Sequence, residues 1–274
     1  MDNVGKILVI GGSPQHHTAP ILTALGAMGA GTGIIHIYSC PANLESAKNH
    51  SSNFVLHSFQ SYTGSLGLYD VKIIYEIAQD IDAIAIGNGL GQDFDSKKAL
   101  LAIININKPI IIDADALIPE ILKIYDSSKH HWILTPYLDE FERLFEVPAT
   151  PANILEVSQK YKINLCVKGH IDYIVTANDF TNNLYSVLKN DLNNIDLGDK
   201  IHANYTGVPE MQINGTGDVL AGIICSYIAQ GLTASHAMKL ATYLFGKCAE
   251  QLIKTSEVFS AESLAKFFPQ FNAI

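Results

Sequence analysis

Short apolar runs alternate with helix-like segments along the chain, and this alternation constrains the fold more than any other feature. The runs that we predict as strands are continuous rather than alternating in polarity, as expected when helices cover both faces of a sheet; they span residues 7–12, 34–39, 53–59, 83–87, 109–114 and 132–136. Helix-like segments follow or separate them, at 18–29, 41–49, 70–79, 95–105, 115–125, 138–145 and 151–161. Such repetition predicts a parallel sheet with right-handed crossovers.

The pattern changes after residue 150. Three apolar runs, at 164–169, 173–178 and 183–188, are separated by short turns, which predicts antiparallel or mixed pairing at one edge of the sheet. Three helices are expected near 216–230, 233–252 and 260–268. Because no linker or repeat interrupts the chain, we predict one α/β domain over residues 1–274, a three-layer α/β/α sandwich with a mostly parallel central sheet.

Composition excludes some classes of protein. Charged residues make up only 16% of the chain, which indicates much buried surface and favours a homo-oligomer. The net charge is -9 and no basic cluster stands out, so we expect no nucleic-acid partner. The four cysteines form no CxxC pair, the first residues do not resemble a signal peptide, and no apolar stretch reaches the length of a membrane helix, about 18 residues. These features predict a cytoplasmic protein with no membrane association.

Residues suited to chemistry gather where the predicted strands end. Ligands of open parallel sheets bind at the carboxyl ends of the strands, and here those ends carry Gly11-Gly12-Ser13, the segment 87–91, Asp113 and Asp115, Thr135-Pro136, and Lys168-Gly169. Each glycine alone is an ordinary turn residue. Together they predict a cleft lined with backbone N–H groups, a lysine and carboxylates.

The segment INGTGDVLAG, residues 213–222, combines flexible residues, a carboxylate and a buried helix. Asn214, Gly215, Thr216 and Gly217 can present backbone N–H groups at the start of that helix, whose dipole also attracts an anion. Asp218 follows in the first turn, where it can accept a proton from a hydroxyl beside a bound phosphate. This arrangement is typical of phosphoryl transfer to a hydroxyl. The alternative, left open here, is that the segment only caps the helix.

The same segment resembles the GTGDVLAG signature of the NAD(P)H-hydrate dehydratases, a branch of the ribokinase-like superfamily. Further motifs appear in the order of that family, in GGSPQHHTAP (11–20) with GAMGAG (26–31), GNGLG (87–91), IIIDADAL (110–117), LTPYLDEFERLF (134–145) and VKGH (167–170). The resemblance covers nearly the whole chain. It implies a ribokinase-like fold and a repair reaction, the dehydration of hydrated NADH and NADPH with ADP or ATP and Mg²⁺.

The resemblance also implies roles for individual residues. Asp218 would be the base that activates the hydroxyl on the hydrated nicotinamide ring, which is then phosphorylated and leaves as phosphate. Residues implied to contact the substrate are Ala19, Gly89, Gly91, Tyr137 and Asp218. Residues implied to contact the nucleotide are Lys168, Gly169, His170, Ile171, Asp172, Asn214, Gly215, Thr216 and Gly217. Mg²⁺ would bridge the phosphates with few protein ligands, so no metal-ligating residue is assigned, and a tetramer is the assembly implied.

The chain departs from the family pattern at several substrate motifs. Tyr137-Leu138-Asp139 replaces His-Pro-Gly, and GVPEMQINGTGD (207–218) replaces GNPGMATGGTGD. GPGLG has become GNGLG at 87–91, and Thr18-Ala19 replaces Gly-Ala. The base and the phosphate loop are kept while several substrate contacts differ. We therefore expect retained nucleotide binding with weaker dehydratase activity.

Other interpretations of these residues stay open. Thr135-Pro136 with Asp139 and Glu140 is also typical of a helix start. The pairs His16-His17 and His130-His131 lack a third metal ligand and are expected in solvent-facing turns. Asp113 and Asp115 could cap the next helix. The alternative functions are a small-molecule kinase of the same fold and a diverged nucleotide-binding protein with little turnover.

Overall fold

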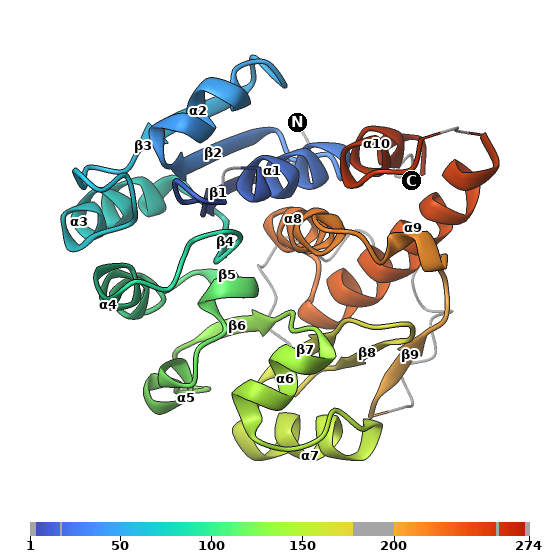
Figure 1. Cartoon of the computed structure of the whole chain (residues 1–274). Helices are drawn as coiled ribbons and strands as arrows, with labels where there is room; N and C mark the ends of the chain where they lie inside the picture. The colour runs from blue at the N-terminus through green and yellow to red at the C-terminus, as the bar shows by residue number, and fades with distance from the viewer. Residues whose placement is uncertain (1–3, 17, 178–199, 256–257, 272–274) are drawn as a thin grey trace.

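A single nine-stranded sheet runs through the part of the chain that the structure describes. The computed structural model describes residues 4–16, 18–177, 200–255 and 258–271. The strand order is β3-β2-β1-β4-β5-β6-β7-β8-β9 (Figure 1). The strands are β1 (Lys6–Ile10), β2 (Ile34–Ser39), β3 (Phe54–Ser58), β4 (Ala83–Ile86), β5 (Pro109–Ile112), β6 (His131–Leu134), β7 (Asn164–Val167), β8 (Asp172–Val175) and β9 (His202–Asn204).

Pairing is parallel from β3 to β7 and antiparallel between β7, β8 and β9. This confirms the mostly parallel sheet with a mixed edge that the sequence predicts. The third predicted run of that edge, 183–188, lies outside the described residues. Strand β9 was not predicted, because its three residues, His-Ala-Asn, carry no apolar run. Chain order reverses between β1 and β4, and the crevice at such a switch point is where open sheets bind ligands.

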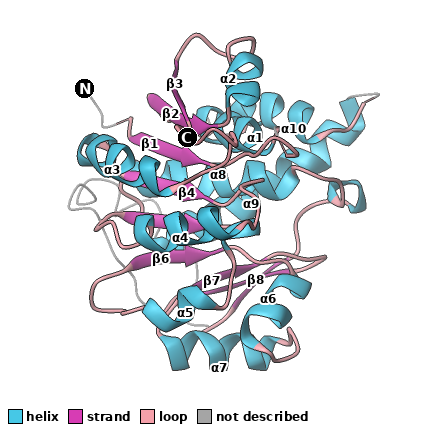
Figure 2. Ribbon diagram, turned by 60° about the vertical axis from the view of Figure 1, so that its left-hand side comes forward, coloured by secondary structure: helices cyan, strands magenta, loops and turns pink. Residues whose placement is uncertain are grey.

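Helices cover both faces of this sheet. They are α1 (Ala19–Gly29), α2 (Pro41–Ala47), α3 (Leu68–Ile77), α4 (Phe94–Ile103), α5 (Glu120–Ile124), α6 (Leu138–Phe145), α7 (Pro151–Tyr161), α8 (Thr216–Ala229), α9 (Ala234–Thr255) and α10 (Ala261–Phe267). The strands lie stacked between two helical layers when the molecule is viewed from the side (Figure 2).

Alternate residues of the central strands face opposite sides of the sheet and pack against different helical layers. Ile7 and Val9 of β1 belong to one apolar core with α1, α8 and α9, whereas Leu8 and Ile10 belong to another with α3 and α4. Successive side chains of a strand point to opposite faces, so a continuous apolar run supplies both cores. The three-layer α/β/α architecture is thereby confirmed.

One predicted helix is wrong. The segment 115–125 forms a 3-10 turn at Ala114–Ala116 and a separate short helix, α5. Pro119 lies between them at the N-cap of α5. A proline restricts the residue before it to extended conformations and lacks an N–H, so one continuous helix cannot pass through this position.

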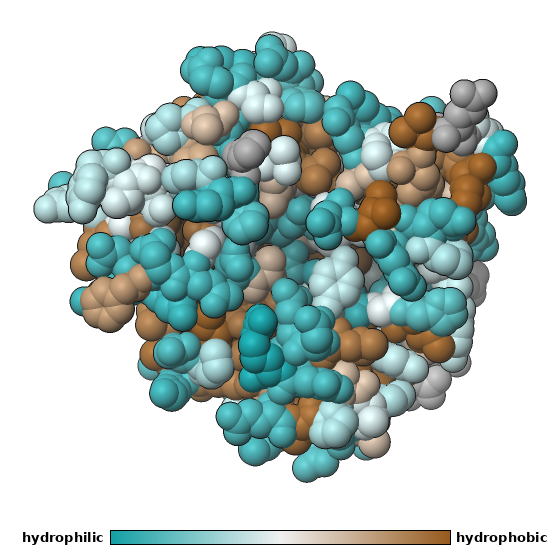
Figure 3. All heavy atoms as spheres, viewed as in Figure 1, coloured by the Kyte–Doolittle hydropathy of each residue, from teal (hydrophilic) through white to brown (hydrophobic). Residues whose placement is uncertain are grey.

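Hydrophilic and hydrophobic residues are interspersed on the face of the molecule in Figure 3. The large hydrophobic side chains exposed on this face are therefore not by themselves evidence for a protein–protein interface. Within the described ranges, no helix is long and apolar enough to cross a membrane.

Helices α1 and α8 pack with their backbones in close contact, which positions the start of α8. A Cβ atom added to Gly222 of α8 would collide with the Thr23 carbonyl oxygen, and one added to Gly26 of α1 would collide with that of Val219. A side chain at either position would force the helices apart. The two glycines therefore set where the residues of α8, Asp218 included, stand relative to the sheet.

We expect Gly222→Ala to lower the free energy of unfolding by about 1–3 kcal/mol, the usual cost of overpacking. Helix propensity alone would make alanine more stable by about 1 kcal/mol. A decrease in the free energy of unfolding would therefore come from the close contact between α1 and α8. Denaturant unfolding followed by circular dichroism measures it. A variant as stable as the parent would show that α1 and α8 can separate without cost.

Candidate active site

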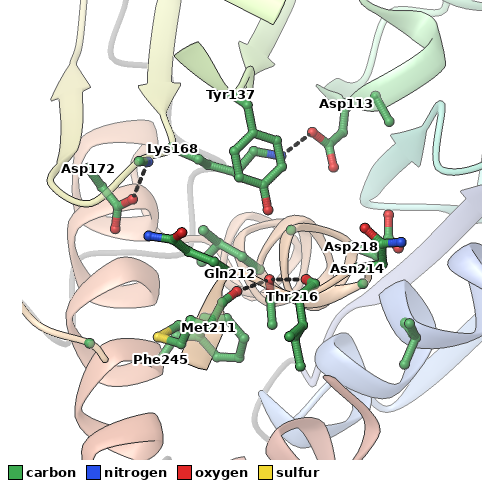
Figure 4. A pocket seen from close by; sticks show the side chains of 18 of the residues that line it. Asp113, Tyr137, Lys168, Asp172, Met211, Gln212, Asn214, Thr216, Asp218 and Phe245 are labelled. Atoms are coloured by element: carbon green, nitrogen blue, oxygen red, sulfur yellow. Dashed lines mark hydrogen bonds and ion pairs between the residues drawn. The ribbon is translucent and has the colours of Figure 1, made fainter. Parts of the chain in front are cut away.

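A cavity of about 1020 Å³ opens at the carboxyl ends of the parallel strands. Its walls come from the loops that follow β1, β4, β5, β6, β7 and β9, and from the start of α8 (Figure 4). The chain thus brings together segments that are more than 200 residues apart, from Gln15 to Gly246. Its position beside the switch point of the sheet is the one expected for a ligand site.

The start of α8 forms one wall of the cavity. Gly215, at the N-cap, has a φ of 98°, a left-handed conformation that glycine adopts without strain. The Thr216 hydroxyl lies 2.8 Å from the carbonyl oxygen of Met211 and 3.0 Å from that of Ile213, and it holds the preceding loop against the helix. The first intrahelical bond runs from Val219 N to Gly215 O, so the N–H groups before it are available to an anion.

Asp218 stands in the first turn of α8 and lines the cavity. Burial raises the pKa of its carboxyl to about 7, and the nearby Asp113 carboxylate also raises it. A hydrogen bond from Asn88 and the charge of Lys168 oppose this rise. A carboxylate with a pKa near neutrality is well matched to accept a proton at physiological pH.

A continuous polar network joins Lys168 to Asp218. Lys168 Nζ donates to Asp113 Oδ1 at 2.6 Å, and Asn88 Nδ2 donates to Asp113 Oδ2 at 2.9 Å and to Asp218 Oδ1 at 2.7 Å. Burial alone would lower the pKa of Lys168, but Asp113 beside it raises that pKa overall. Lys168 is therefore a permanent cation at the floor of the cavity.

Tyr137 lies over this cation. Lys168 Nζ is 4.2 Å from the centre of the Tyr137 ring, a cation–π contact. A Cβ atom added to Gly217 would lie 2.8 Å from the Tyr137 hydroxyl and 3.0 Å from Lys168 Nζ. A side chain at position 217 would require one of these two groups to shift, and the ring points toward the start of α8 (Figure 4). The aromatic side chain narrows the approach to the start of α8.

Two further carboxyl groups line the cavity near Lys168. Burial raises the pKa of Glu140, whose Oε2 accepts the Tyr137 N–H at 2.8 Å. Burial also raises the pKa of Asp172, which accepts from Gly169 N at 3.2 Å and from Asn204 Nδ2 at 3.1 Å. These bonds fix the turn after β7 that carries Gly169.

The structure gathers most of the residues that the sequence analysis selected. Those that line the cavity are Ala19, Gly89, Tyr137, Lys168, Gly169, His170, Asp172, Asn214, Gly215, Thr216, Gly217 and Asp218. Gly91 and Ile171 are not among the lining residues. Gly91 instead donates its N–H to Asp115 Oδ2 at 2.9 Å, which ties the loop after β4 to the loop after β5.

Sequence reasoning selected neither Asn88 nor Glu140 as a site residue. It also did not select Tyr205 and Thr206 or the α9 residues Thr242, Phe245 and Gly246, all of which line the cavity. One available signal was the glycine inside the apolar pattern of α9, because a Cβ atom at Gly246 would collide with the Thr206 side chain. The asparagine between two glycines after β4 was another.

The helix after β6 begins later than a Thr-Pro start implies. Its N-cap is Tyr137, and Leu138 is the first helical residue. Thr135 and Pro136 belong to the connection, where the Pro136 carbonyl oxygen accepts the Lys168 N–H at 2.8 Å. Asp139 and Glu140 do stand in the first turn, as that interpretation requires.

The histidine pairs do not form a metal centre in the described ranges, where no group of three or more His, Cys, Asp or Glu side chains could hold an ion. His130 is buried, contrary to the expectation of a solvent-facing turn. Its Nδ1 accepts the Asp126 N–H at 3.0 Å, and its ring stacks on Trp132 at 4.5 Å. His17 lies outside the described residues.

Comparison with known proteins gives a consistent result. A carbohydrate-kinase family model, described as NAD(P)H-hydrate dehydratase, matches residues 7–270. The ADP-dependent (S)-NAD(P)H-hydrate dehydratase of Staphylococcus aureus is 29% identical over 273 residues, which cover 97% of this chain and 87% of the relative. The bifunctional NAD(P)H-hydrate repair enzyme of Hyperthermus butylicus is 30% identical over 259 residues, 88% of this chain. The chain spans only 43% of the length of that bifunctional relative.

Solved structures share the fold. A ribokinase-like superfamily protein of Enterococcus faecalis has a TM-score of 0.79 at 22% identity, over 98% of this chain and 87% of that one. The ADP/ATP-dependent NAD(P)H-hydrate dehydratase of Bacillus subtilis, co-crystallized with ATP/Mg²⁺ and soaked with CoA, has a TM-score of 0.77 at 24% identity, over 99% and 92%. The predicted ribokinase-like fold is confirmed.

The raised pKa of Asp218 predicts how stability depends on pH. The folded protein holds this proton up to a pH of about 7, whereas the ordinary value is 3.8. The folded state therefore binds the proton more tightly, and stability falls as pH rises between these two values. Because Asn at 218 does not titrate, we expect Asp218→Asn to be more stable than the parent by about 1–3 kcal/mol at pH 8, with no such gain at pH 4.

Urea unfolding of both proteins from pH 4 to pH 8 measures this difference. A gain that stayed constant across the range would contradict a raised pKa at this carboxyl.

Proposed function

The chain belongs to the NAD(P)H-hydrate dehydratase family, and from this premise we propose that it catalyses the nucleotide-dependent dehydration of hydrated NADH or NADPH. The observation that carries the proposal is the placement of Asp218. Its carboxylate stands in the first turn of α8, beside the N–H groups of the Gly215–Gly217 loop, and its pKa lies near neutrality. A base adjacent to a phosphate site suits transfer of a phosphoryl group to a hydroxyl.

Asp218 acts first as a general base. It accepts the proton of the ring hydroxyl while the hydroxyl oxygen bonds to phosphorus and the nucleotide P–O bond breaks. The start of α8 holds the transferred phosphate through backbone N–H groups and the helix dipole. The lone pair of the ring nitrogen then expels phosphate, a proton leaves the neighbouring ring carbon, and the dihydronicotinamide is restored.

The nucleotide occupies the side of the cavity formed by Lys168–Asp172 and Asn214–Gly217. The Lys168 ammonium already pairs with Asp113, so its charge stabilises phosphate through space while the N–H groups of the loop bind directly. The S. aureus relative is described as ADP-dependent, which supports a nucleotide co-substrate here.

Mg²⁺ would be held by the nucleotide phosphates and by water, because a small hard cation prefers oxygen ligands and keeps several waters. The cavity offers oxygen donors and N–H groups that suit a phosphate-bound ion. We assign it no protein ligand. When bound, the ion neutralises charge that develops on the transferred group.

The substrate side of the cavity consists of Ala19, Gly89 and Tyr137 with Asp218. Gly91 is not among the lining residues, so its predicted contact would be indirect. A homo-oligomer, a tetramer by resemblance, and a cytoplasmic location stay predictions. Light scattering on the purified protein would test the first.

Incubation with hydrated NADH, Mg²⁺ and either ADP or ATP tests the function. Return of the absorbance of the reduced ring reports dehydration. Accumulation of a phosphorylated product without that absorbance would instead identify a small-molecule kinase. Tight nucleotide binding without either signal would identify a nucleotide-binding protein without turnover.

We expect Asp218→Asn to reduce turnover by about 100-fold to 10,000-fold, the usual effect of losing a general base. Nucleotide affinity should change little, because the N–H groups of residues 215–217 remain. Steady-state kinetics and calorimetric titration with ADP separate the two effects. Wild-type turnover in this variant would end the assignment of Asp218 as the base.

Restoring the family motif at 137–139 should raise activity. We expect the triple change Tyr137→His, Leu138→Pro and Asp139→Gly to increase kcat/KM for hydrated NADH by about tenfold, since each 1.4 kcal/mol of binding is a factor of ten. Proline fits because Leu138 is the first residue of α6. Kinetics of both proteins measure the change, with ADP affinity as the control. A parent chain that is already as efficient would show that Tyr137 does not obstruct the substrate.

A further inference from the structure

Asn88 lies at the point where β4 ends and is fully buried. Its neighbours Gly87 and Gly89 have φ values of 121° and 64°, so the chain turns sharply on both sides of it. The Asn88 carbonyl oxygen accepts the Gly12 N–H at 2.8 Å, which ties this turn to the loop after β1. The backbone thus fixes the side chain beneath the start of α8.

The amide group of Asn88 bridges two carboxylates. Nδ2 donates one hydrogen to Asp113 Oδ2 at 2.9 Å and the other to Asp218 Oδ1 at 2.7 Å. Carboxylate oxygens only accept hydrogen bonds when ionised, so the amide must present its NH₂ group to them. Its own Oδ1 is buried with no hydrogen-bond partner. The two carboxylates therefore orient the side chain, and its Oδ1 atom is left without a hydrogen bond.

We propose that Asn88 is a positioning residue, which occupies Oδ1 of Asp218 and leaves Oδ2 as the atom that accepts the proton of the substrate hydroxyl. This inference rests on the proposed function for the identity of the hydroxyl. A proton on Oδ1 would face the N–H of Asn88, whereas a proton on Oδ2 meets no such conflict. The bridge also fixes the carboxylate plane relative to the phosphate loop.

The charges around Asp218 explain why such a bridge matters. Asp113 and Asp115 both raise the pKa of Asp218, while Lys168 and the Asn88 hydrogen bond lower it. Without the amide, two carboxylates would face each other with only Lys168 to compensate. Asn88 thus keeps the base ionised closer to neutral pH.

This role is particular to the GNGLG segment of the chain. The family pattern to which the segment was compared has proline at this position, and a proline side chain has no donor. Asn88→Pro keeps the backbone carbonyl that Gly12 binds and removes the side-chain amide, but it also removes the backbone N–H of residue 88 and fixes its φ. Asn88→Ala removes the amide with less constraint on the backbone, so the two variants do not share the same risk of misfolding.

Asn43 supplies a matched control. It is also fully buried and its Oδ1 also lacks a partner. Its Nδ2 donates to Ser39 Oγ at 2.6 Å and does not reach a cavity carboxylate. Asn43→Ala therefore removes a buried amide that makes no hydrogen bond to Asp113 or Asp218.

Carbon-13 NMR of the aspartate carboxyls reads the result without needing turnover, with the Asp218 signal assigned by its loss in Asp218→Asn. We expect Asn88→Ala and Asn88→Pro to raise the pKa of Asp218 by roughly one unit, and Asn43→Ala to leave it unchanged. The acid limb of the pH profile of kcat/KM should move by the same amount, so that activity lost at neutral pH returns at higher pH.

An unshifted Asp218 titration in both Asn88 variants would overturn the proposal, as would a loss of activity equal at every pH. If the unmodified chain does not act on hydrated NADH, the proposed function fails. The NMR titration then still decides whether Asn88 orients Asp218, so the two failures are distinguishable.

Discussion

The buried ion pair between Lys168 and Asp113 organises the carboxyl edge of the sheet. The two side chains come from the ends of β7 and β5, and they are 5% and 2% exposed. Removing either partner would leave a buried charge, which typically costs about 3–5 kcal/mol. Tyr137 packs on the cation of this pair, Asn88 binds its anion, and through Asn88 the pair reaches Asp218. The site is therefore one electrostatic unit whose parts cannot be changed independently.

The sequence was sufficient for the layers of the fold because continuous apolar runs have one stable solution, burial on both faces of a sheet. It was sufficient to predict that Asp218 and residues 214–217 lie together beside a cavity, because glycines, a carboxylate and a buried helix are adjacent in the chain. It failed where contacts are distant in sequence. Asn88 contacts residues 25 and 130 positions away, and its place between two glycines indicates a turn but not which side chains it contacts. The edge strand β9 was not predicted because it is short and polar. The break at Pro119 was not predicted because the segment 115–125 was interpreted as one helix in spite of its proline.

Two of the departures from the family pattern contact the charged groups of the site directly. Tyr137 and Asn88 are neutral side chains that contact the charged groups of the site, while Lys168, Asp113 and Asp218 themselves are retained. These two side chains alter the access to the charged groups and their orientation, while Lys168, Asp113 and Asp218 keep their charges. The chain therefore keeps the ionisable groups on which the proposed reaction depends and differs in the neutral side chains that contact them.

The stack of His130 on Trp132 lies away from the cavity, and Trp132 is the only tryptophan of the chain. Its indole is buried, donates to the Ile104 carbonyl oxygen at 3.1 Å, and belongs to the core on the α3 and α4 side of the sheet. Its fluorescence therefore reports on the integrity of that core. Neither His130 nor Trp132 lines the cavity, so a ligand there makes no contact with the indole, and we expect its emission to respond to loss of folding rather than to occupation of the site.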